Sequence, residues 1–125
     1  MNIDNINRLA DVIEAQSHTD REAEDGFAMN CFFHTCGTPA CIAGWADFLA
    51  NGDEWVASDT LESRSQNVEG RAMEWLGMSS SQRYELFWGG TKIADLAKVT
   101  PTHAAAVLRH LAVTGNVDWS VGEPT

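Results

Sequence analysis

The sequence predicts an all-α fold: a single compact domain of about five short helices, with one short strand allowed. Three observations support this prediction. Apolar residues recur at helical spacing in several separate segments. Residues that favour the first and last turns of helices flank those segments. The chain has 125 residues, of which 44% are hydrophobic and 21% charged, and this is enough to form one core.

The first predicted helix opens the chain and ends near Gln16, and either Asn2 or Asp4 is suited to cap its N-terminus. Its apolar face consists of Ile3, Ile6, Leu9, Ala10 and Ile13. The acidic segment 17–26 has no periodicity and indicates a loop. In residues 27–33, one set of apolar side chains occupies every second position, which permits the short strand. The side chains at the positions between them are mostly not polar, unlike those of a typical half-buried strand.

The second predicted helix runs from about residue 39 to residue 50 and stops at Asn51-Gly52. Thr38 is suited to cap it, and Pro39 fits the first helical position. Its buried face is predicted to hold Ile42, Trp45, Ala46 and Leu49. The third helix follows Asn67 as its cap and ends at Gly77, with Val68, Ala72, Trp75 and Leu76 as its apolar stripe.

The remaining helices also have clear start and stop signals. Residues 79–82 form the pattern of a capping box, which predicts a fourth helix that ends at Gly89-Gly90. A helical turn or two is expected within 93–97. The pair Thr100-Pro101 predicts the start of the last helix, and Gly115 its end. Val117 and Trp119 are then expected to fold the tail back onto the core.

The charge of the chain is strongly negative and unevenly distributed. The formal net charge is −10, and residues 1–70 carry thirteen acids against three bases. Such a surface repels nucleic acid backbones and anionic membranes, so neither is an expected partner. Neither a signal peptide nor a long apolar span is evident, which leads us to expect a cytoplasmic protein with reduced thiols. Two interpretations of this charge are open: it serves solubility alone, or it attracts a basic protein.

One short run contains all three cysteines and offers two kinds of chemistry. Cys31, His34, Cys36 and Cys41 are ligand types that zinc prefers, but their spacing differs from the usual two pairs. We therefore expect no cofactor, with a structural zinc as the alternative. The competing interpretation is that these cysteines behave as small hydrophobic residues.

A cysteine nucleophile is the second possibility for this run. Cys36, just ahead of a predicted helix, is the better candidate, with His103 or His110 of the last helix as its base. Cys41 is expected to be buried on the apolar face and inert. The acidic surroundings disfavour a thiolate, and both histidines are expected to be half-exposed with their hydrogen bonds satisfied. The sequence thus favours a protein that is not an enzyme.

A partner-binding surface is the preferred functional hypothesis. Its predicted acidic residues are Asp20, Glu22, Glu24 and Asp25 in the first loop, with Asp53 and Glu54 after the second helix. Trp55 and Trp88 stand beside polar or glycine-rich turns, where tryptophans can anchor an interface. These features predict a small acidic binding or regulatory protein that acts through a protein partner, expected to be basic.

Two segments resemble one group of known sequences. The run Cys36-Gly37-Thr38-Pro39-Ala40-Cys41-Ile42-Ala43-Gly44-Trp45-Ala46 resembles a signature of small uncharacterised proteins of bacteria and their phages. The stretch from Thr100 to Trp119 looks like the closing segment of the same group, and with the first helix the likeness covers most of the chain. The resemblance implies a stand-alone cytosolic protein with phage or prophage connections. It implies no activity, cofactor or catalytic residue.

Overall fold

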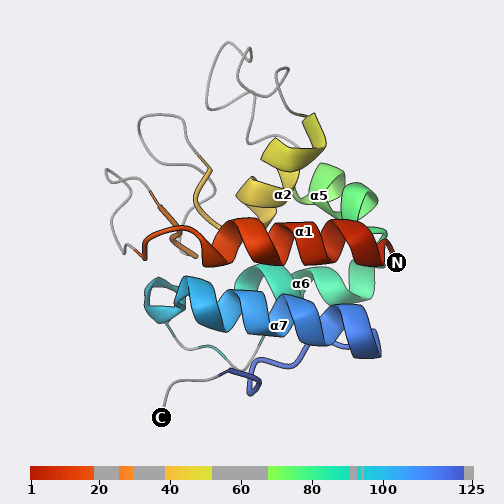
Figure 1. Ribbon diagram of the computed structural model, residues 1–125. Coiled ribbons are helices and arrows are strands. Elements are labelled where there is room, and N and C mark those ends of the chain that lie inside the picture. The colour runs from red at the N-terminus through yellow and green to blue at the C-terminus, as the bar shows by residue number, and fades with distance from the viewer. Residues whose placement is uncertain (19–25, 30–38, 52–67, 91–92, 94, 123–125) are drawn as a thin grey trace.

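Five α-helices form the regular structure in the computed structural model, which describes residues 1–18, 26–29, 39–51, 68–90, 93 and 95–122 (Figure 1). They are α1 (Ile3–Glu14), α2 (Ile42–Asn51), α5 (Val68–Leu76), α6 (Ser80–Trp88) and α7 (Pro101–Thr114), with a 3-10 helix η1 at Leu96–Lys98. The prediction of an all-α fold is confirmed. The allowed strand does not form over residues 27–29, where Phe27 makes an isolated bridge with His18, and residues 30–33 lie outside the described part.

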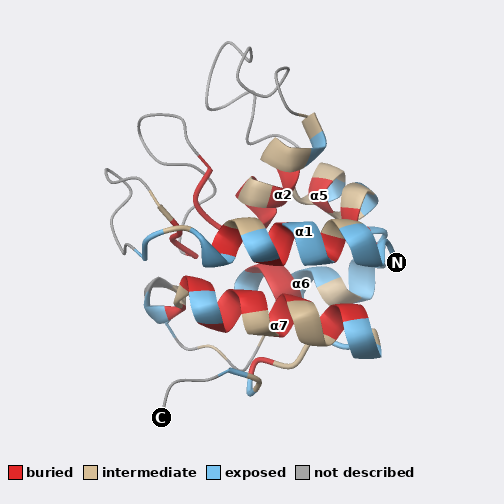
Figure 2. Ribbon diagram, in the orientation of Figure 1, coloured by how far each residue is buried: buried red, intermediate tan, exposed pale blue. Residues whose placement is uncertain are grey.

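The helices pack as two pairs around a shared core. α1 lies along α7 and α2 lies along α5, with α6 behind the first pair in Figure 1. Figure 2 shows that buried residues from every helix face this interior. The largest completely buried side chains include Phe27, Phe87, Ile6, Leu9, Leu108 and Leu111. Among the described residues, no helix is long and apolar enough to cross a membrane.

The first and last helices form as their sequence signals predict. Asn2 caps α1, because its side-chain oxygen accepts the Asn5 backbone N–H at 3.1 Å. Thr100 caps α7 in the same way, by accepting the His103 N–H at 3.1 Å. Gly115 ends α7 with a positive φ of 78°, a conformation that costs glycine little. Local signals are therefore sufficient to define this helix pair.

The start of α2 differs from the prediction. The helix begins at Ile42, three residues after Pro39, and the predicted cap Thr38 lies outside the described residues. The Ala40 carbonyl accepts the Ala28 N–H at 2.9 Å, so this backbone is tied to another segment before the helix begins. Cys41 takes the capping position instead, since its sulfur accepts the Gly44 N–H at 3.4 Å.

The predicted capping box at the start of α6 is wrong. Ser79 is in the capping conformation, but its hydroxyl forms a 2.8 Å hydrogen bond with the Ser81 hydroxyl rather than capping the helix. Gln82, the expected reciprocal partner, donates from its side-chain nitrogen to the Gly115 carbonyl at 2.7 Å. A contact between the start of α6 and the end of α7 thus replaces the local capping bond.

The tail after α7 folds back onto the core, as predicted. Trp119 is buried, and its indole N–H donates to the Glu85 carbonyl of α6 at 2.6 Å. Its own carbonyl lies 2.7 Å from Nε2 of His103. The two rings meet edge to face, with their centroids 5.3 Å apart. These contacts hold residues 116–122 against the first turn of α7.

Candidate functional site

Most of the predicted cysteine and histidine site falls outside the described residues. Cys31, His34 and Cys36 all belong to the segment 30–38. Cys41 is buried, as expected, and its sulfur serves as the cap of α2. Within the described ranges, no three His, Cys, Asp or Glu side chains are grouped so that they could hold a metal ion. The zinc and nucleophile hypotheses therefore stay predictions.

His103 is more buried than predicted. Only 4% of the residue is exposed, so the expectation of a half-exposed histidine is wrong at this position. Because a carbonyl can only accept, Nε2 must carry a proton to bond the Trp119 oxygen. That nitrogen is therefore occupied in holding the tail. The burial of His103 could not be predicted from local sequence, because it depends on a contact with Trp119, sixteen positions along the chain.

The predicted acidic partner-binding residues also lie outside the described part of the chain. These are Asp20, Glu22, Glu24, Asp25, Asp53 and Glu54, together with Trp55. Trp88 is described, and 38% of it is exposed on α6. Its indole N–H donates to the carboxylate of Glu69 on α5.

Trp88 has an aromatic neighbour on the same side of α6. Tyr84 stands four residues earlier, which places the two side chains next to each other on one helical face. Tyr84 is 57% exposed, although aromatic side chains of this size are usually buried. We call Tyr84 and Trp88 the aromatic face. Sequence reasoning identified Trp88 and missed Tyr84, although the spacing of four residues was a usable signal.

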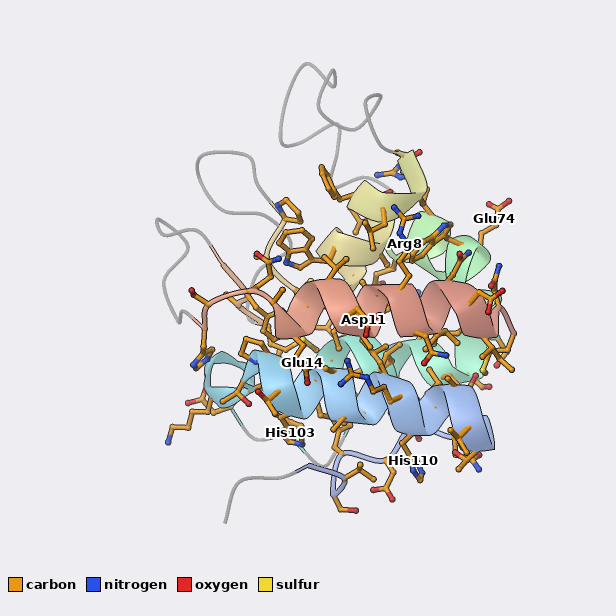
Figure 3. All side chains as sticks on the ribbon, in the orientation of Figure 1. Arg8, Asp11, Glu14, Glu74, His103 and His110 are labelled. Atoms are coloured by element: carbon orange, nitrogen blue, oxygen red, sulfur yellow. The ribbon has the colours of Figure 1, made fainter. Side chains whose placement is uncertain are left out.

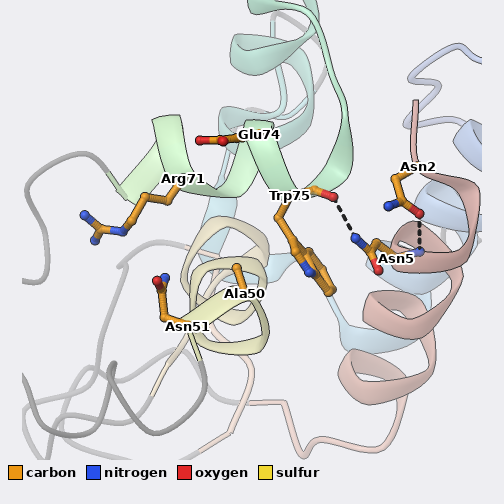
Figure 4. Close-up of a pocket in the computed structure, with 7 residues that line it drawn as sticks. All are labelled: Asn2, Asn5, Ala50, Asn51, Arg71, Glu74 and Trp75. Atoms are coloured by element: carbon orange, nitrogen blue, oxygen red, sulfur yellow. Dashed lines mark hydrogen bonds between the residues drawn. The ribbon is translucent and has the colours of Figure 1, made fainter.

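A second candidate site is a hollow of about 520 Å³ between the first turn of α1, the end of α2 and one side of α5 (Figure 4). We call it the α1–α2–α5 hollow. It is lined by Asn2, Asn5, Ala50, Asn51, Arg71, Glu74 and Trp75. A neighbouring hollow of about 530 Å³ shares Asn2 and Glu74 with it and adds Asp4. Glu74 thus borders both hollows.

A buried ion pair fixes one wall of the α1–α2–α5 hollow. Asp47 of α2 is completely buried, and it accepts from Nε and Nη2 of Arg71 at 2.6 and 3.0 Å. The Asn51 side-chain nitrogen donates to the same carboxylate at 2.6 Å. The hydrogen bonds that Arg71 donates to Asp47 raise the pKa of Arg71 above its ordinary value, which keeps the guanidinium charged. The orientation of Arg71 is therefore set by Asp47.

The asparagine side chains at this hollow have a defined orientation. Asn5 donates from its side-chain nitrogen to the Trp75 carbonyl at 2.8 Å, and Asn51 donates to the Asp47 carbonyl at 2.9 Å. Because both partners are oxygens, the amide nitrogen must face them and the amide oxygen must turn away. Among the described residues, neither oxygen receives a hydrogen bond. Asn5 lies beside the indole of Trp75, whereas Ala50 lies between that indole and Asn51 (Figure 4).

The buried pair was not predicted, although one signal pointed to it. Asp47 sits between Ala46 and Phe48 in an otherwise apolar stretch of α2, where a charged residue needs a partner. Its partner Arg71 lies 24 residues away, so sequence alone could not identify it. The chain matches no protein family, no curated protein and no solved structure in the comparisons with known proteins.

Proposed function

We propose that this protein acts by binding a protein partner, and that the aromatic face on α6 belongs to the binding surface. The observation that carries the proposal is the exposure of Tyr84 and Trp88 side by side. Exposed large aromatic side chains are costly to leave in water, and they dominate the binding energy of many interfaces. A fixed indole, held by Glu69, also loses little conformational freedom on binding.

The charge of the chain supports a basic partner. A net charge of −10 attracts a positively charged surface and accelerates encounter, and salt should weaken that attraction. The acidic residues Asp20, Glu22, Glu24, Asp25, Asp53 and Glu54, with Trp55, are proposed to contribute to the same interaction. A cytoplasmic setting with phage or prophage connections is part of this proposal, supported by the sequence resemblance.

Retention of partners by the immobilised protein tests the proposal. Tyr84→Ser removes an exposed ring that makes no described hydrogen bond, so the fold should be unaffected. The matched control is Val113→Ser, because Val113 is an 85% exposed apolar residue on α7. We expect a partner that is retained at low salt, released at high salt, lost with Tyr84→Ser and kept with Val113→Ser. Equal retention by both variants would exclude the aromatic face.

A further inference from the structure

The end of α6, which carries the aromatic face, receives a hydrogen bond from the tail of the chain. The last four carbonyls of a helix have no partner within it, and in α6 the first of these belongs to Glu85. The Gly89 and Gly90 N–H groups both bond the Tyr84 carbonyl. The Glu85 carbonyl accepts the indole N–H of Trp119, at 2.6 Å. The tail therefore completes the last turn of α6.

Contacts with the start of α7 fix the orientation of Trp119. The tail runs back along α7 from the end of that helix towards its first turn (Figure 1). There the Trp119 carbonyl accepts from His103, which Figure 3 labels at the start of α7, and the two rings meet edge to face. Trp119 is also buried. Because its carbonyl and its ring are both held, the indole N–H is directed at α6.

Gly122 allows the tail to lie close against α7. Its φ of 72° is in the left-handed region, which glycine adopts at little cost. A Cβ atom at this position would lie 2.6 Å from Cβ of Ala106 on α7, which is too short for two carbon atoms. A side chain at this position would therefore push the tail away from α7, while Trp119 and α6 keep their own residues.

We propose that Trp119 is a positioning residue for the aromatic face, so that partner binding depends on the attachment of the tail. Glu85 follows Tyr84 directly and precedes Trp88 by three residues, so the bonded carbonyl belongs to the turn that joins the two rings. Helix ends open easily, and detachment of the tail frays this turn. The Trp88 indole then loses its alignment with Glu69. This inference rests on the proposed function for the role of the aromatic face and adds its regulation by the tail.

A packing role is the competing explanation for Trp119, because its ring belongs to the hydrophobic core. The two roles differ in what they do to the folded protein. A packing role lowers the free energy of unfolding but leaves α6 unchanged while the protein stays folded. A positioning role loosens the end of α6 under the same conditions, since the Glu85 carbonyl loses its donor.

The test is NMR of the ¹⁵N-labelled protein without a partner, well below its melting temperature. Trp119→Phe keeps a ring and removes the N–H, and Gly122→Ala displaces the tail with Trp119 unchanged. We expect amide exchange of Gly89 and Gly90 to accelerate about fivefold in both variants, the effect of losing a hydrogen bond that contributes ~1 kcal/mol. The Trp88 indole N–H signal should shift in both, because its hydrogen bond to α5 weakens.

The matched control is Gly26→Ala. It introduces the same side chain at another positive φ, 112°, where a Cβ would lie 2.4 Å from the Ser17 backbone oxygen. This variant should be less stable, with the exchange at the end of α6 and the Trp88 signal unchanged. Equal changes in the control would overturn the inference, as would the absence of any change in Trp119→Phe and Gly122→Ala.

Partner retention then tests the link to binding. We expect the salt-sensitive partner to be retained less by Gly122→Ala than by the wild type, because binding must order the last turn of α6 again. Gly26→Ala should retain it fully. Full retention by Gly122→Ala, in a protein whose α6 signals have changed, would overturn the inference. Full retention by Tyr84→Ser would instead exclude the proposed function, and the NMR result without a partner does not depend on it.

Discussion

One arginine joins the two helices within each helix pair of this protein, and the two arginines do so in different surroundings. Arg109 of α7 binds Asp11 and Glu14 of α1, each at 2.9 Å, where all three side chains are substantially exposed. Figure 3 shows both carboxylates on the side of α1 that faces α7. Arg71 of α5 binds Asp47 of α2, whose side chain is completely buried. The distances are similar and the two arginine side chains are almost equally exposed, at 34% and 40%, so the burial of the carboxylate separates the two cases.

Burial changes what each ion pair does for the molecule. Water and salt screen the Arg109 contacts, and the helices they join are already defined by caps and an apolar stripe. The carboxylate of Asp47 is shielded from water in the folded protein, so its charge must be stabilised by Arg71. The buried pair also fixes a wall of the α1–α2–α5 hollow. The contacts of Arg109 link α1 to α7 at the surface. The contact of Arg71 with Asp47 both stabilises the fold and shapes a candidate site.

The largest effect is expected from Arg71→Ala. The change leaves a completely buried carboxylate without its guanidinium, which typically costs about 3–5 kcal/mol. Urea denaturation at neutral pH measures the change in the free energy of unfolding. Arg83→Ala is the control, because Arg83 is exposed and its oxygen partner on Glu69 lies 3.7 Å away. A loss below about 1 kcal/mol for Arg71→Ala would show that burial does not separate the two arginines.

The start of α2 should matter next. Cys41→Ala removes the sulfur that accepts the Gly44 N–H, and loss of a helix cap costs about 1 kcal/mol. Cys41→Ser should cost less than Cys41→Ala, since a hydroxyl oxygen is a better acceptor for the same N–H. Thermal unfolding of the two variants gives the ranking. The reverse order would mean that the sulfur contributes by packing rather than by capping.

A smaller effect is expected from Arg109→Ala. Exposed ion pairs contribute roughly 0–1 kcal/mol, so the loss should stay within about 1 kcal/mol and shrink as salt is added. The measurement is urea denaturation at low and high ionic strength. A large loss that salt does not change would indicate that the stem of Arg109 acts through packing instead.

Acid should remove the contribution of Arg109. Hydrogen bonding to Arg109 lowers the pKa of Glu14 below its ordinary value of 4.5. The folded state therefore prefers the ionised carboxylate, so this stability is present above that value and is lost as the pH falls through the lowered pKa. The difference in melting temperature between the wild type and Arg109→Ala should vanish in strong acid. A constant difference from pH 7 downward would contradict this linkage.

The sequence predicts the parts of the fold that depend on neighbours along the chain. Asn2, Thr100 and Gly115 each act on residues within one turn, so α1 and α7 follow from the sequence with nearly correct ends. The sequence predicts the start of α2 about three residues too early, because Pro39 suits a first helical position. In the structure the carbonyl of Ala40 accepts the Ala28 N–H, so the helix begins only at Ile42. The capping box failed because Gln82 finds a partner on another helix.

The candidate sites were less predictable because they depend on contacts between distant segments. Trp88 was identified from its position beside glycines, and its exposure agrees with that expectation. The pairing of Asp47 with Arg71 joins residues 24 positions apart, and the contact of Asn5 with Trp75 spans 70. No local pattern contains such information. A charged residue inside an apolar stretch indicates that a partner exists, but it does not identify the partner.

Amide hydrogen exchange of the protein, measured with and without its retained partner, shows whether the aromatic face on α6 is the binding surface. We expect slower exchange in α6 around Tyr84 and Trp88 when the partner is bound. Exchange should be unchanged at the exposed end of α7 around Val113. Protection at Val113 with none in α6 would contradict the account, because the partner would then bind the α1–α7 pair rather than the aromatic face.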